Sequence, residues 1–172
     1  GSNDKKNNVR KNIQIVSKKI GFKVSNLLFL NQIHSNKFHF CIKKTRKKLK
    51  GDGLITNTPG LAIGILTADC APILFYDKQK KIIGAAHAGW RGAYKKIIIK
   101  IIKYLVKNGS NLNNLYFVIG PSIAQKNYEV GKEFKKKFIN QNIKNLKYFK
   151  ITQKRIFFSL RDYIKGQLKD LG

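Results

Sequence analysis

The sequence predicts a protein of the α/β class, in which short strands and amphipathic helices share a core. Several short apolar segments bounded by turn residues are typical of buried strands. One longer segment, residues 91–108, repeats its apolar residues with the period of a helix. The 172 residues suffice for one core, and neither an internal repeat nor a Pro/Gly/Ser-rich linker divides them. We therefore expect a single domain over residues 1–172.

The expected elements can be placed along the chain from its apolar pattern. Strands are predicted at 13–16, 27–33, 54–56, 61–66, 73–76, 82–86 and 116–119. The lysine-rich residues 77–81 fit a hairpin loop. Helices are predicted over 91–108, 129–139 and 159–170. Gly109 provides a natural stop for the first helix, and the basic run 43–50 is expected to form an exposed loop.

The chain is strongly basic, with 36 Lys and Arg, 8 Asp and Glu, and a formal net charge of +28. This charge raises the hypothesis of a basic polyanion-binding protein. Only five of the 36 basic residues are Arg, the residue that base recognition and bidentate phosphate contacts favour. Because Lys, Asn and Ile are also the residues that AT-rich codons supply, we interpret the charge mainly as a solvated surface and expect no nucleic-acid partner.

Other sequence features limit the class of protein. No apolar run is long enough for a membrane span, and no signal-peptide pattern follows Gly1-Ser2, which resembles a cloning scar. The two cysteines, Cys41 and Cys70, do not make a disulfide framework. These features favour a reduced, cytoplasmic protein without a membrane partner. The oligomeric state does not follow from the sequence.

Residues 51–77 differ from the rest of the chain in charge. This segment contains three Asp but neither Lys nor Arg. In so basic a chain the gap indicates a buried or chemically constrained region, and a plain core hairpin would produce the same gap. Gly51-Asp52-Gly53 is typical of a turn that leads into the strand at 54–56.

Residues suited to chemistry follow predicted strands in three places. The segments are residues 31–35 (Asn-Gln-Ile-His-Ser), 67–72 (Thr-Ala-Asp-Cys-Ala-Pro) and 86–92 (Ala-His-Ala-Gly-Trp-Arg-Gly). Active-site groups are often found at such positions, because strands are rigid and their ends face solvent.

One thiol and two imidazoles occur in these segments, at Cys70, His34 and His87. This donor set suits Zn²⁺, and three protein ligands leave a fourth position for water, whose pKa falls toward roughly 7 on zinc. The spacings do not form a local metal motif. A buried structural Cys with two hydrogen-bonded His, and a Cys70–His87 nucleophile pair, are the alternatives. His39 is interpreted as a surface residue.

The segment around Arg91 is suited to anion binding. Small residues precede the predicted helix, and free N–H groups at a helix start beside an Arg bind phosphate. A surface ion pair of Arg91 and core packing of Trp90 are equally compatible with the pattern. Gly120 and Ser122, in the turn after the strand at 116–119, either line a pocket or form a simple turn.

These segments together resemble one family. The elements are Gln32-Ile33-His34, Thr67-Ala68-Asp69-Cys70-Ala71-Pro72, His87-Ala88-Gly89-Trp90-Arg91-Gly92, Ile119-Gly120-Pro121-Ser122-Ile123 and Tyr128-Glu129-Val130-Gly131. Their order and approximate spacing resemble the laccase-domain family, also called the polyphenol oxidase or purine nucleoside phosphorylase-like family, which includes the bacterial peptidoglycan editing factor. The resemblance covers roughly residues 25–171.

The resemblance implies an α/β fold with mixed sheets sandwiched between helices, and zinc held by His34, Cys70 and His87. It implies phosphorolysis of adenosine, inosine, guanosine and methylthioadenosine, and deamination of adenosine, with a purine nucleoside and phosphate as partners. Cys70, His87, Asp69 and Arg91 are then expected to be catalytic. Gln32, Arg91, Gly120 and Ser122 are expected to bind substrate. Copper fits less well, because the chain has three His and no Met.

Some features depart from the family pattern. The family usually has more residues before Gln32-Ile33-His34, and it continues past Gln167–Gly172 with a Cys-Thr-containing strand and an Arg-rich tail. Ser159 stands where the family often has Asp. We therefore expect a C-terminal family segment to be missing, which would weaken or abolish substrate binding. Hydrolytic editing of a peptidoglycan precursor is the alternative activity that the resemblance implies.

Overall fold

The computed structural model describes residues 4–43 and 49–171. Its α-helices are α1 (Lys6–Lys19), α2 (Trp90–Tyr94), α3 (Ile97–Lys107), α4 (Lys132–Gln141) and α5 (Leu160–Lys169). Its strands are β1 (Leu27–Phe29), β2 (Phe38–Phe40), β3 (Gly53–Thr56), β4 (Ala62–Gly64), β5 (Ala71–Asp77), β6 (Ile82–Ala88), β7 (Leu115–Ile119), β8 (Glu129–Val130), β9 (Phe149–Thr152) and β10 (Arg155–Phe158).

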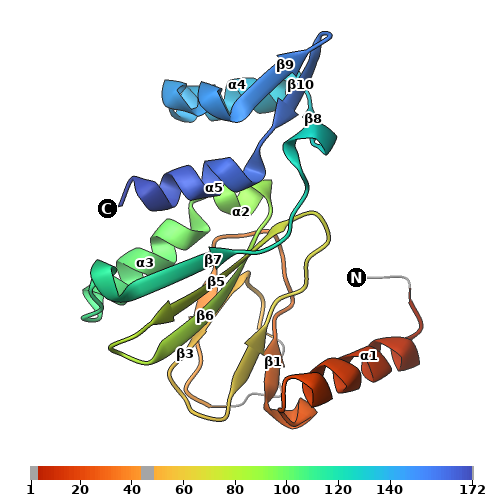
Figure 1. The fold of residues 1–172 in the computed structure, drawn as a ribbon, viewed down its shortest axis with the longest axis vertical. Helices are drawn as coiled ribbons and strands as arrows, with labels where there is room; N and C mark the ends of the chain where they lie inside the picture. The colour runs from red at the N-terminus through yellow and green to blue at the C-terminus, as the bar shows by residue number, and fades with distance from the viewer. Residues whose placement is uncertain (1–3, 44–48, 172) are drawn as a thin grey trace.

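A five-stranded mixed sheet forms the centre of the fold, in the order β2-β3-β6-β5-β7. Strands β2 and β3 pair in parallel, and the other neighbours pair antiparallel. A parallel pair, β1-β4, and an antiparallel sheet, β8-β10-β9, complete the strands. Figure 1 shows α4 with β9 and β10 at one end of the long axis and α1 beside β1 toward the other. The expected α/β class with mixed sheets is confirmed.

The core forms where α3 packs on the central sheet. Isoleucines recur on one face of α3, and Ile97, Ile98, Ile101 and Ile102 are each at most 2% exposed. They share a buried cluster with sheet residues such as Ile55. Because β-branched Ile is a mediocre helix former, this burial stabilises α3 more than helix propensity does.

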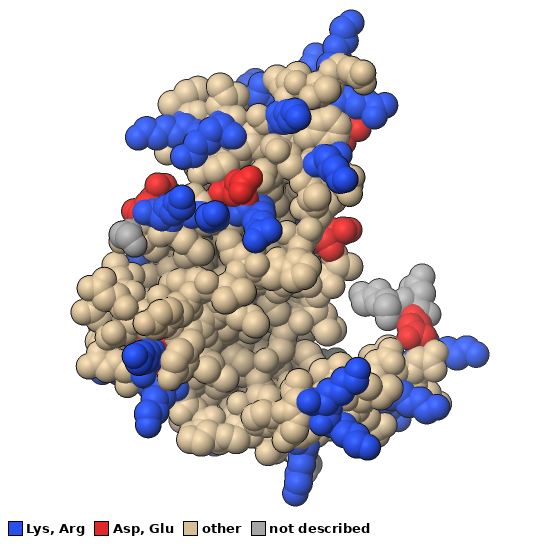
Figure 2. Space-filling model, in the orientation of Figure 1, with Lys and Arg blue, Asp and Glu red and all other residues tan. Residues whose placement is uncertain are grey.

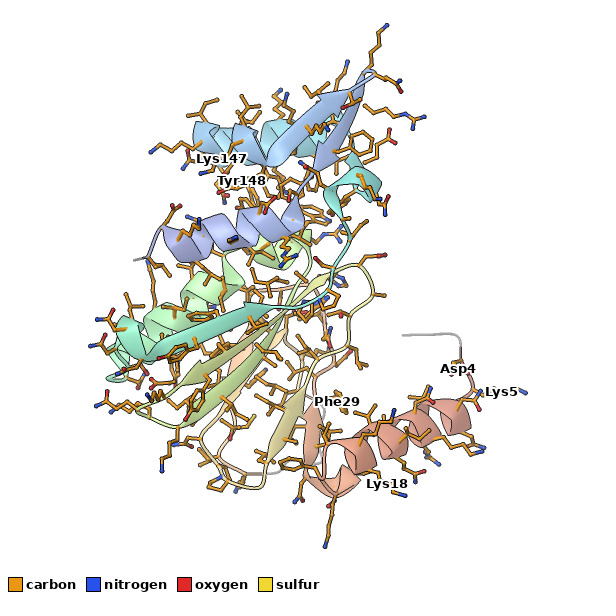
Figure 3. All side chains as sticks on the ribbon, in the orientation of Figure 1. Asp4, Lys5, Lys18, Phe29, Lys147 and Tyr148 are labelled. Carbon is orange, nitrogen blue, oxygen red and sulfur yellow. The ribbon has the colours of Figure 1, made fainter. Side chains whose placement is uncertain are left out.

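Aromatic side chains connect the end that contains α4 to the rest of the core. Phe138 of α4 is fully buried and stacks on Phe134, and it meets Phe158 of β10 and Tyr163 of α5 edge-on or tilted at centroid distances of 4.8 and 5.0 Å. Lys147 lies over the Tyr148 ring on the outside of this cluster (Figure 3). The packing of α5 against this cluster and against α2 joins the two parts.

Close packing also explains a glycine in the small sheet. Gly64 of β4 pairs with Phe29 of β1, and a Cβ at Gly64 would lie 2.6 Å from Cε1 of the Phe29 ring (Figure 3). A larger residue at this position would therefore displace Phe29.

One of the expected elements is wrong in type. Residues 13–16 lie inside helix α1, because their apolar residues belong to a stripe through Val9, Ile13, Val16 and Ile20 with helical spacing. The helix expected over 129–139 forms as α4 but begins only at Lys132, because residues 129–130 are a strand. The expected helix 91–108 is divided into α2 and α3, because Lys96 between them adopts a left-handed backbone with φ of 57°.

The remaining expected elements match observed ones, with shorter strands at 27–33 and 61–66. The hairpin at 77–81 forms, and Oδ1 of Asp77 accepts hydrogen bonds from the main-chain N–H groups of Gln79 and Lys80. Within the basic run 43–50, residues 44–48 lie outside the described residues.

Charged side chains are unevenly distributed in the structure, as they are in the sequence, where residues 51–77 contain neither Lys nor Arg. Figure 2 shows Lys and Arg mostly toward the ends of the visible face, whereas its middle is largely uncharged. Two of the three Asp in the gap, Asp52 and Asp77, are fully buried. Asp69 is exposed. The segment without Lys or Arg therefore combines the buried strand β3 and the alternately buried strand β5 with an exposed loop at residues 66–69, which contains Asp69.

The importance of the α3 face for stability can be tested within one helix. Replacing Ile101, which is fully buried, with Ala should lower the free energy of unfolding by about 2–5 kcal/mol through lost burial and a residual cavity. The control Val106→Ala changes an exposed residue of the same helix and should alter it by less than about 0.5 kcal/mol. Urea unfolding measures both. Equal effects of the two substitutions would contradict the packing described for α3.

Candidate metal centre and adjoining cavity

Three chain segments meet at one end of the central sheet. Cys70 immediately precedes β5, and His87 lies near the end of β6, where the antiparallel register pairs it with Pro72. The third segment reaches the same place because Asp52, next to β3, holds the loop that carries His34. Residues far apart in the chain are thus gathered by strand pairing and by one buried carboxylate.

The ligand atoms of His34, Cys70 and His87 lie within 4.8 Å of one another. The Sγ atom of Cys70 is 3.9 Å from Nε2 of His34, and the two imidazole rings meet edge-on with centroids 4.9 Å apart. His87 is buried, Cys70 is half-buried and His34 is exposed, so the group opens to solvent on one side. Two nitrogen donors and one sulfur donor at this separation fit a transition-metal ion with an open coordination position.

The glycine before α2 leaves room for these ligands. A Cβ on Gly89 would lie 2.8 Å from Sγ of Cys70 and 3.1 Å from Cδ2 of His34. Its backbone φ of −69° is ordinary, so it is space that requires glycine here.

Asp52 has no exposed surface, and its carboxylate accepts several hydrogen bonds. The donors are the main-chain N–H groups of Ile33, His34 and Ser35, the Ser35 hydroxyl, and Nδ1 of His87. Although burial by itself raises the pKa of this carboxyl, the hydrogen bonds from Ser35, His87 and His34 outweigh it and hold the pKa below its ordinary value. Asp52 is therefore an ionised carboxylate.

The ionised state of Asp52 decides the tautomer of His87. A carboxylate only accepts hydrogen bonds, so Nδ1 of His87, 2.9 Å from Oδ1, carries the proton and donates it. The Nε2 atom then presents a lone pair, which is the form in which an imidazole binds a metal ion.

The environment of Cys70 argues against a freely reactive thiolate. Burial, and then the negative charges of Asp69 and Asp52, raise the pKa of the Cys70 thiol. A thiol with a raised pKa is a weak nucleophile without further activation. A coordinated divalent cation, by contrast, deprotonates a thiol outright. The chemistry of the donor set therefore favours Cys70 as a metal ligand over the Cys70–His87 nucleophile pair.

A cavity of about 210 Å³ adjoins two of the three candidate ligands. Its lining combines two of the ligands with acidic, basic, aromatic and aliphatic side chains: His34, Asp69, Cys70, Trp90, Arg91, Ile123, Tyr128 and Leu160. Asp69 is held by a left-handed backbone with φ of 71°, and its carbonyl accepts a hydrogen bond from the N–H of Ile123. The cavity thus joins the loop before β5 to the turn after β7.

Arg91 and Tyr128 supply the polar groups of the cavity beside Asp69. The guanidinium of Arg91 is exposed and lies over the Trp90 ring, 4.8 Å from its centroid. Burial is the main cause that raises the pKa of Tyr128 to about 12, with Cys70 adding to the shift. The Tyr128 phenol therefore stays protonated at neutral pH and can donate a hydrogen bond into the cavity.

Three of the residues expected to bind substrate lie outside this lining. The side-chain amide of Gln32 exchanges two hydrogen bonds with the main chain of Leu66, both 2.7 Å long. Gly120 packs against Pro72, where a Cβ would lie 2.8 Å from Cγ. Ser122 belongs to the same turn but does not line the cavity. The roles of these three residues in substrate binding remain predictions.

Asp52 and the cavity residues Tyr128, Ile123 and Leu160 were not among the site residues expected from the sequence. Asp52 was assigned only to a turn, although its position in a segment without Lys or Arg was a signal of burial. Tyr128 and Ile123 stand in segments that resemble the family, but neither was assigned a role in the site. Trp90 was weighed as a core residue, and it meets Phe134 edge-on while also lining the cavity.

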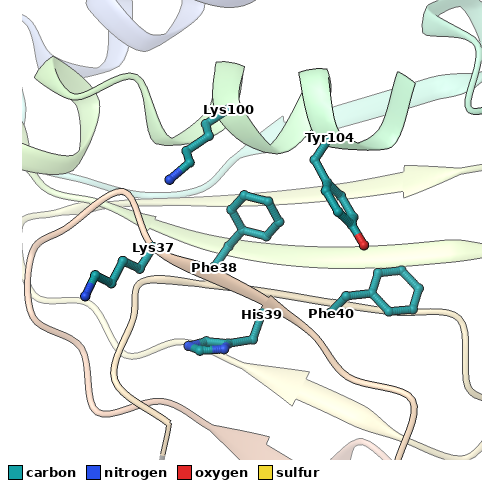
Figure 4. Close-up of a pocket in the computed structure, with 6 residues that line it drawn as sticks. All are labelled: Lys37, Phe38, His39, Phe40, Lys100 and Tyr104. Atoms are coloured by element: carbon teal, nitrogen blue, oxygen red, sulfur yellow. The ribbon is translucent and has the colours of Figure 1, made fainter. Parts of the chain in front are cut away.

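Another pocket lies between β2 and α3, away from the candidate metal ligands. Figure 4 shows its lining, which joins aromatic rings to two lysines: Lys37, Phe38, His39, Phe40, Lys100 and Tyr104. His39, expected to be a surface residue, is half-buried, and its Nε2 is 2.9 Å from the carbonyl oxygen of Lys50. None of the residues expected to be catalytic or metal-binding lines this pocket.

Fold and site together define an α/β protein with a candidate two-histidine, one-cysteine metal centre at the end of its central sheet. Comparison with known proteins agrees with this class. The sequence profile of the family described as multi-copper polyphenol oxidoreductase laccase matches residues 1–172. The chain belongs to this family.

Relatives and solved structures support the assignment to the family. A purine nucleoside phosphorylase of Rickettsia conorii is 37% identical over 174 residues, which cover 98% of this chain and 72% of the relative. One of Aquifex aeolicus is 41% identical over 133 residues, covering 76% of this chain and 62% of the relative. The crystal structure of the hypothetical protein YfiH of Bacillus licheniformis superposes with a TM-score of 0.90 at 27% identity, covering 99% of this chain and 68% of that one.

The described residues include no helix that is both long enough and apolar enough to cross a membrane.

The space at Gly89 provides a test of the ligand arrangement. Replacing Gly89 with Ala places a methyl group against Cys70 and His34, and should weaken Zn²⁺ binding about 10-fold or more, as disturbance around metal ligands typically does. Competition with a chromophoric chelator measures this affinity.

The matched control is Gly131→Ala. Gly131 also precedes a helix with an extended backbone, but among the described residues no atom lies within 4 Å of the added Cβ. This variant should bind Zn²⁺ like the wild type. Equal affinity of all three proteins would mean that the ligands do not meet beside Gly89.

Proposed function

We propose that this chain is a zinc-dependent purine nucleoside enzyme, which carries out phosphorolysis of adenosine, inosine, guanosine and methylthioadenosine and deaminates adenosine. The observation that carries the proposal is the group formed by His34, Cys70 and His87 beside a cavity that contains an arginine. The relatives named purine nucleoside phosphorylase supply the substrate class.

The donor set supports zinc over copper. Two nitrogens and one thiolate suit Zn²⁺, and a tautomer of His87 with a free Nε2 is already set by Asp52. Mononuclear blue-copper centres of similar ligands usually add a weak axial Met, and this chain has none. With only three His in the chain, and His39 in another pocket, a further His-rich copper centre has no ligands.

In the proposed mechanism His34, Cys70 and His87 would hold the ion. A zinc ion with an open coordination position would supply Lewis-acid chemistry and would lower the pKa of water there. Asp69, an exposed carboxylate next to Cys70, moves the proton during deamination. Its left-handed backbone is tied to Ile123, which holds the carboxylate at the cavity.

Arg91 binds phosphate, and the aromatic residues bind the purine. The guanidinium lies at the cavity on top of Trp90, which holds it in place, and a guanidinium offers paired donors to phosphate. Trp90 and Tyr128 provide flat apolar surface beside it. The cavity of about 210 Å³ is below the roughly 300–1,000 Å³ of typical ligand sites, so the base or the ribose enters and the remainder lies at the mouth.

The direct test compares the two cysteines. Cys70→Ala should lose zinc and activity, whereas Cys41→Ala, which changes a buried cysteine of a separate apolar cluster, should keep both. Purified variants are assayed for zinc content and for release of hypoxanthine or adenine from nucleosides, with and without phosphate. Full zinc and full activity in Cys70→Ala would refute the proposed site.

The phosphate role of Arg91 is tested by Arg91→Ala. Loss of a charge-assisted hydrogen bond of about 1.5–3 kcal/mol should lower kcat/KM for phosphate by about 10- to 100-fold. Arg155→Ala is the control, because Arg155 is exposed and its ion-pair partner is Glu129 at 3.8 Å. It should leave the phosphate dependence unchanged. An unchanged phosphate dependence in Arg91→Ala would place the phosphate elsewhere.

A further inference from the structure

We propose that Asp52 is the positioning residue of the metal centre, whose buried carboxylate holds His34 and His87 in the orientations that bind a metal ion. That the ion is zinc rests on the proposed function. The contacts of Asp52 that support this proposal all lie within the protein and involve no metal ion.

On one side, the carboxylate is enclosed by the loop that carries His34. Three successive main-chain N–H groups, of Ile33, His34 and Ser35, point at it with N···O distances of 3.2, 2.9 and 2.6 Å. The Ser35 hydroxyl adds a bond of 2.7 Å. Successive backbone N–H groups that converge in this way form an anion-binding nest. The anion in this nest is a side chain of the same protein.

The loop needs such an anion to keep its shape. His34 has a φ of 55°, in the left-handed region that a residue with a side chain adopts only at an energetic cost. Without a carboxylate, the converging N–H groups would also lack an acceptor. Asp52 offsets both costs, and the imidazole of His34 is thereby placed 3.9 Å from Sγ of Cys70.

On its other side, the same carboxylate orients the second histidine. Oδ1 of Asp52 accepts the Nδ1 proton of His87 at 2.9 Å, which leaves Nε2 for the metal ion. The main chains are also joined, because the N–H of His87 donates to the carbonyl of Asp52 at 2.7 Å. Asp52 is thus fixed to β6 by its backbone, and it connects the two histidines through one side chain.

Asp77, a second buried carboxylate, provides a comparison, because its hydrogen bonds stabilise only a turn. Asp77 is also fully buried, and its Oδ1 accepts the N–H groups of Gln79 and Lys80 in a hairpin. Its Oδ2 has no hydrogen-bond partner among the described residues. Asp77 therefore stabilises a turn, whereas both oxygens of Asp52 are used and one of them faces a metal ligand.

The test is Asp52→Asn, with Asp77→Asn as the matched control. An Asn at position 52 has one acceptor and one NH₂ donor, so either Ser35 N–H or His87 Nδ1–H must face a donor. We expect Zn²⁺ affinity to fall about 10- to 100-fold in Asp52→Asn, as for other carboxylate partners of metal-bound histidines. It should be unchanged in Asp77→Asn. Equal zinc affinity of Asp52→Asn and wild type would overturn the proposal.

A second readout uses the metal-free proteins. Nitrogen-15 NMR of the imidazoles should show His87 as the Nδ1–H tautomer in the wild type and in Asp77→Asn, and a gain of the Nε2–H tautomer in Asp52→Asn. An Nε2–H tautomer in the wild type would overturn the role of Asp52. Absence of zinc binding by the wild type would instead overturn the proposed function, and the tautomer would still decide the role of Asp52.

If Asp52→Asn fails to fold, Ser35→Ala replaces it. This variant keeps the carboxylate and His87 and removes only the hydroxyl bond to Asp52 and the Ser35 Oγ acceptor for Lys37 N–H. It should weaken Zn²⁺ binding by a smaller factor while His87 keeps its Nδ1–H tautomer. Zinc affinity equal to that of the wild type would then contradict the proposal.

Discussion

A single buried carboxylate, that of Asp52, is the interaction on which the arrangement of the site depends. A charged group with no exposed surface is tolerated only when its partners replace the water it has lost. Here the replacement comes from a loop nest on one side and an imidazole on the other. The cost of burying the charge is thus offset by bonds that also fix two candidate ligands.

The sheet explains why this arrangement forms at one end of the molecule. Antiparallel pairing of β5 with β6 brings the residue before one strand beside the last residues of the other. Pairing of β3 with β6 brings Asp52 beside His87. The buried isoleucine face of α3 holds this sheet from one side, so the strand ends are supported by the largest part of the core. Ligands placed on such a scaffold need little further ordering when an ion binds.

Much of the fold and part of the site could be predicted from the sequence. The short strands from β3 to β7 were predictable because apolar runs between turn residues leave few alternatives, and His34, Cys70 and His87 were predictable as chemically apt residues at strand ends. Helix α1 was not predicted, because the four apolar-rich residues 13–16 were considered alone, and the helical spacing of the apolar residues is visible only over the longer segment from Val9 to Ile20. The role of Asp52 was not predictable, because its hydrogen-bond partners Ser35 and His87 are 17 and 35 residues away in the chain and come together only in the fold.

The proposal that His34, Cys70 and His87 together hold one zinc ion can be tested by X-ray absorption spectroscopy at the zinc edge, since sulfur and nitrogen ligands scatter differently. We expect one zinc per chain, with one sulfur and two imidazole nitrogens as protein ligands. A zinc environment without sulfur, or a chain that binds no zinc when it is supplied, would refute this metal centre.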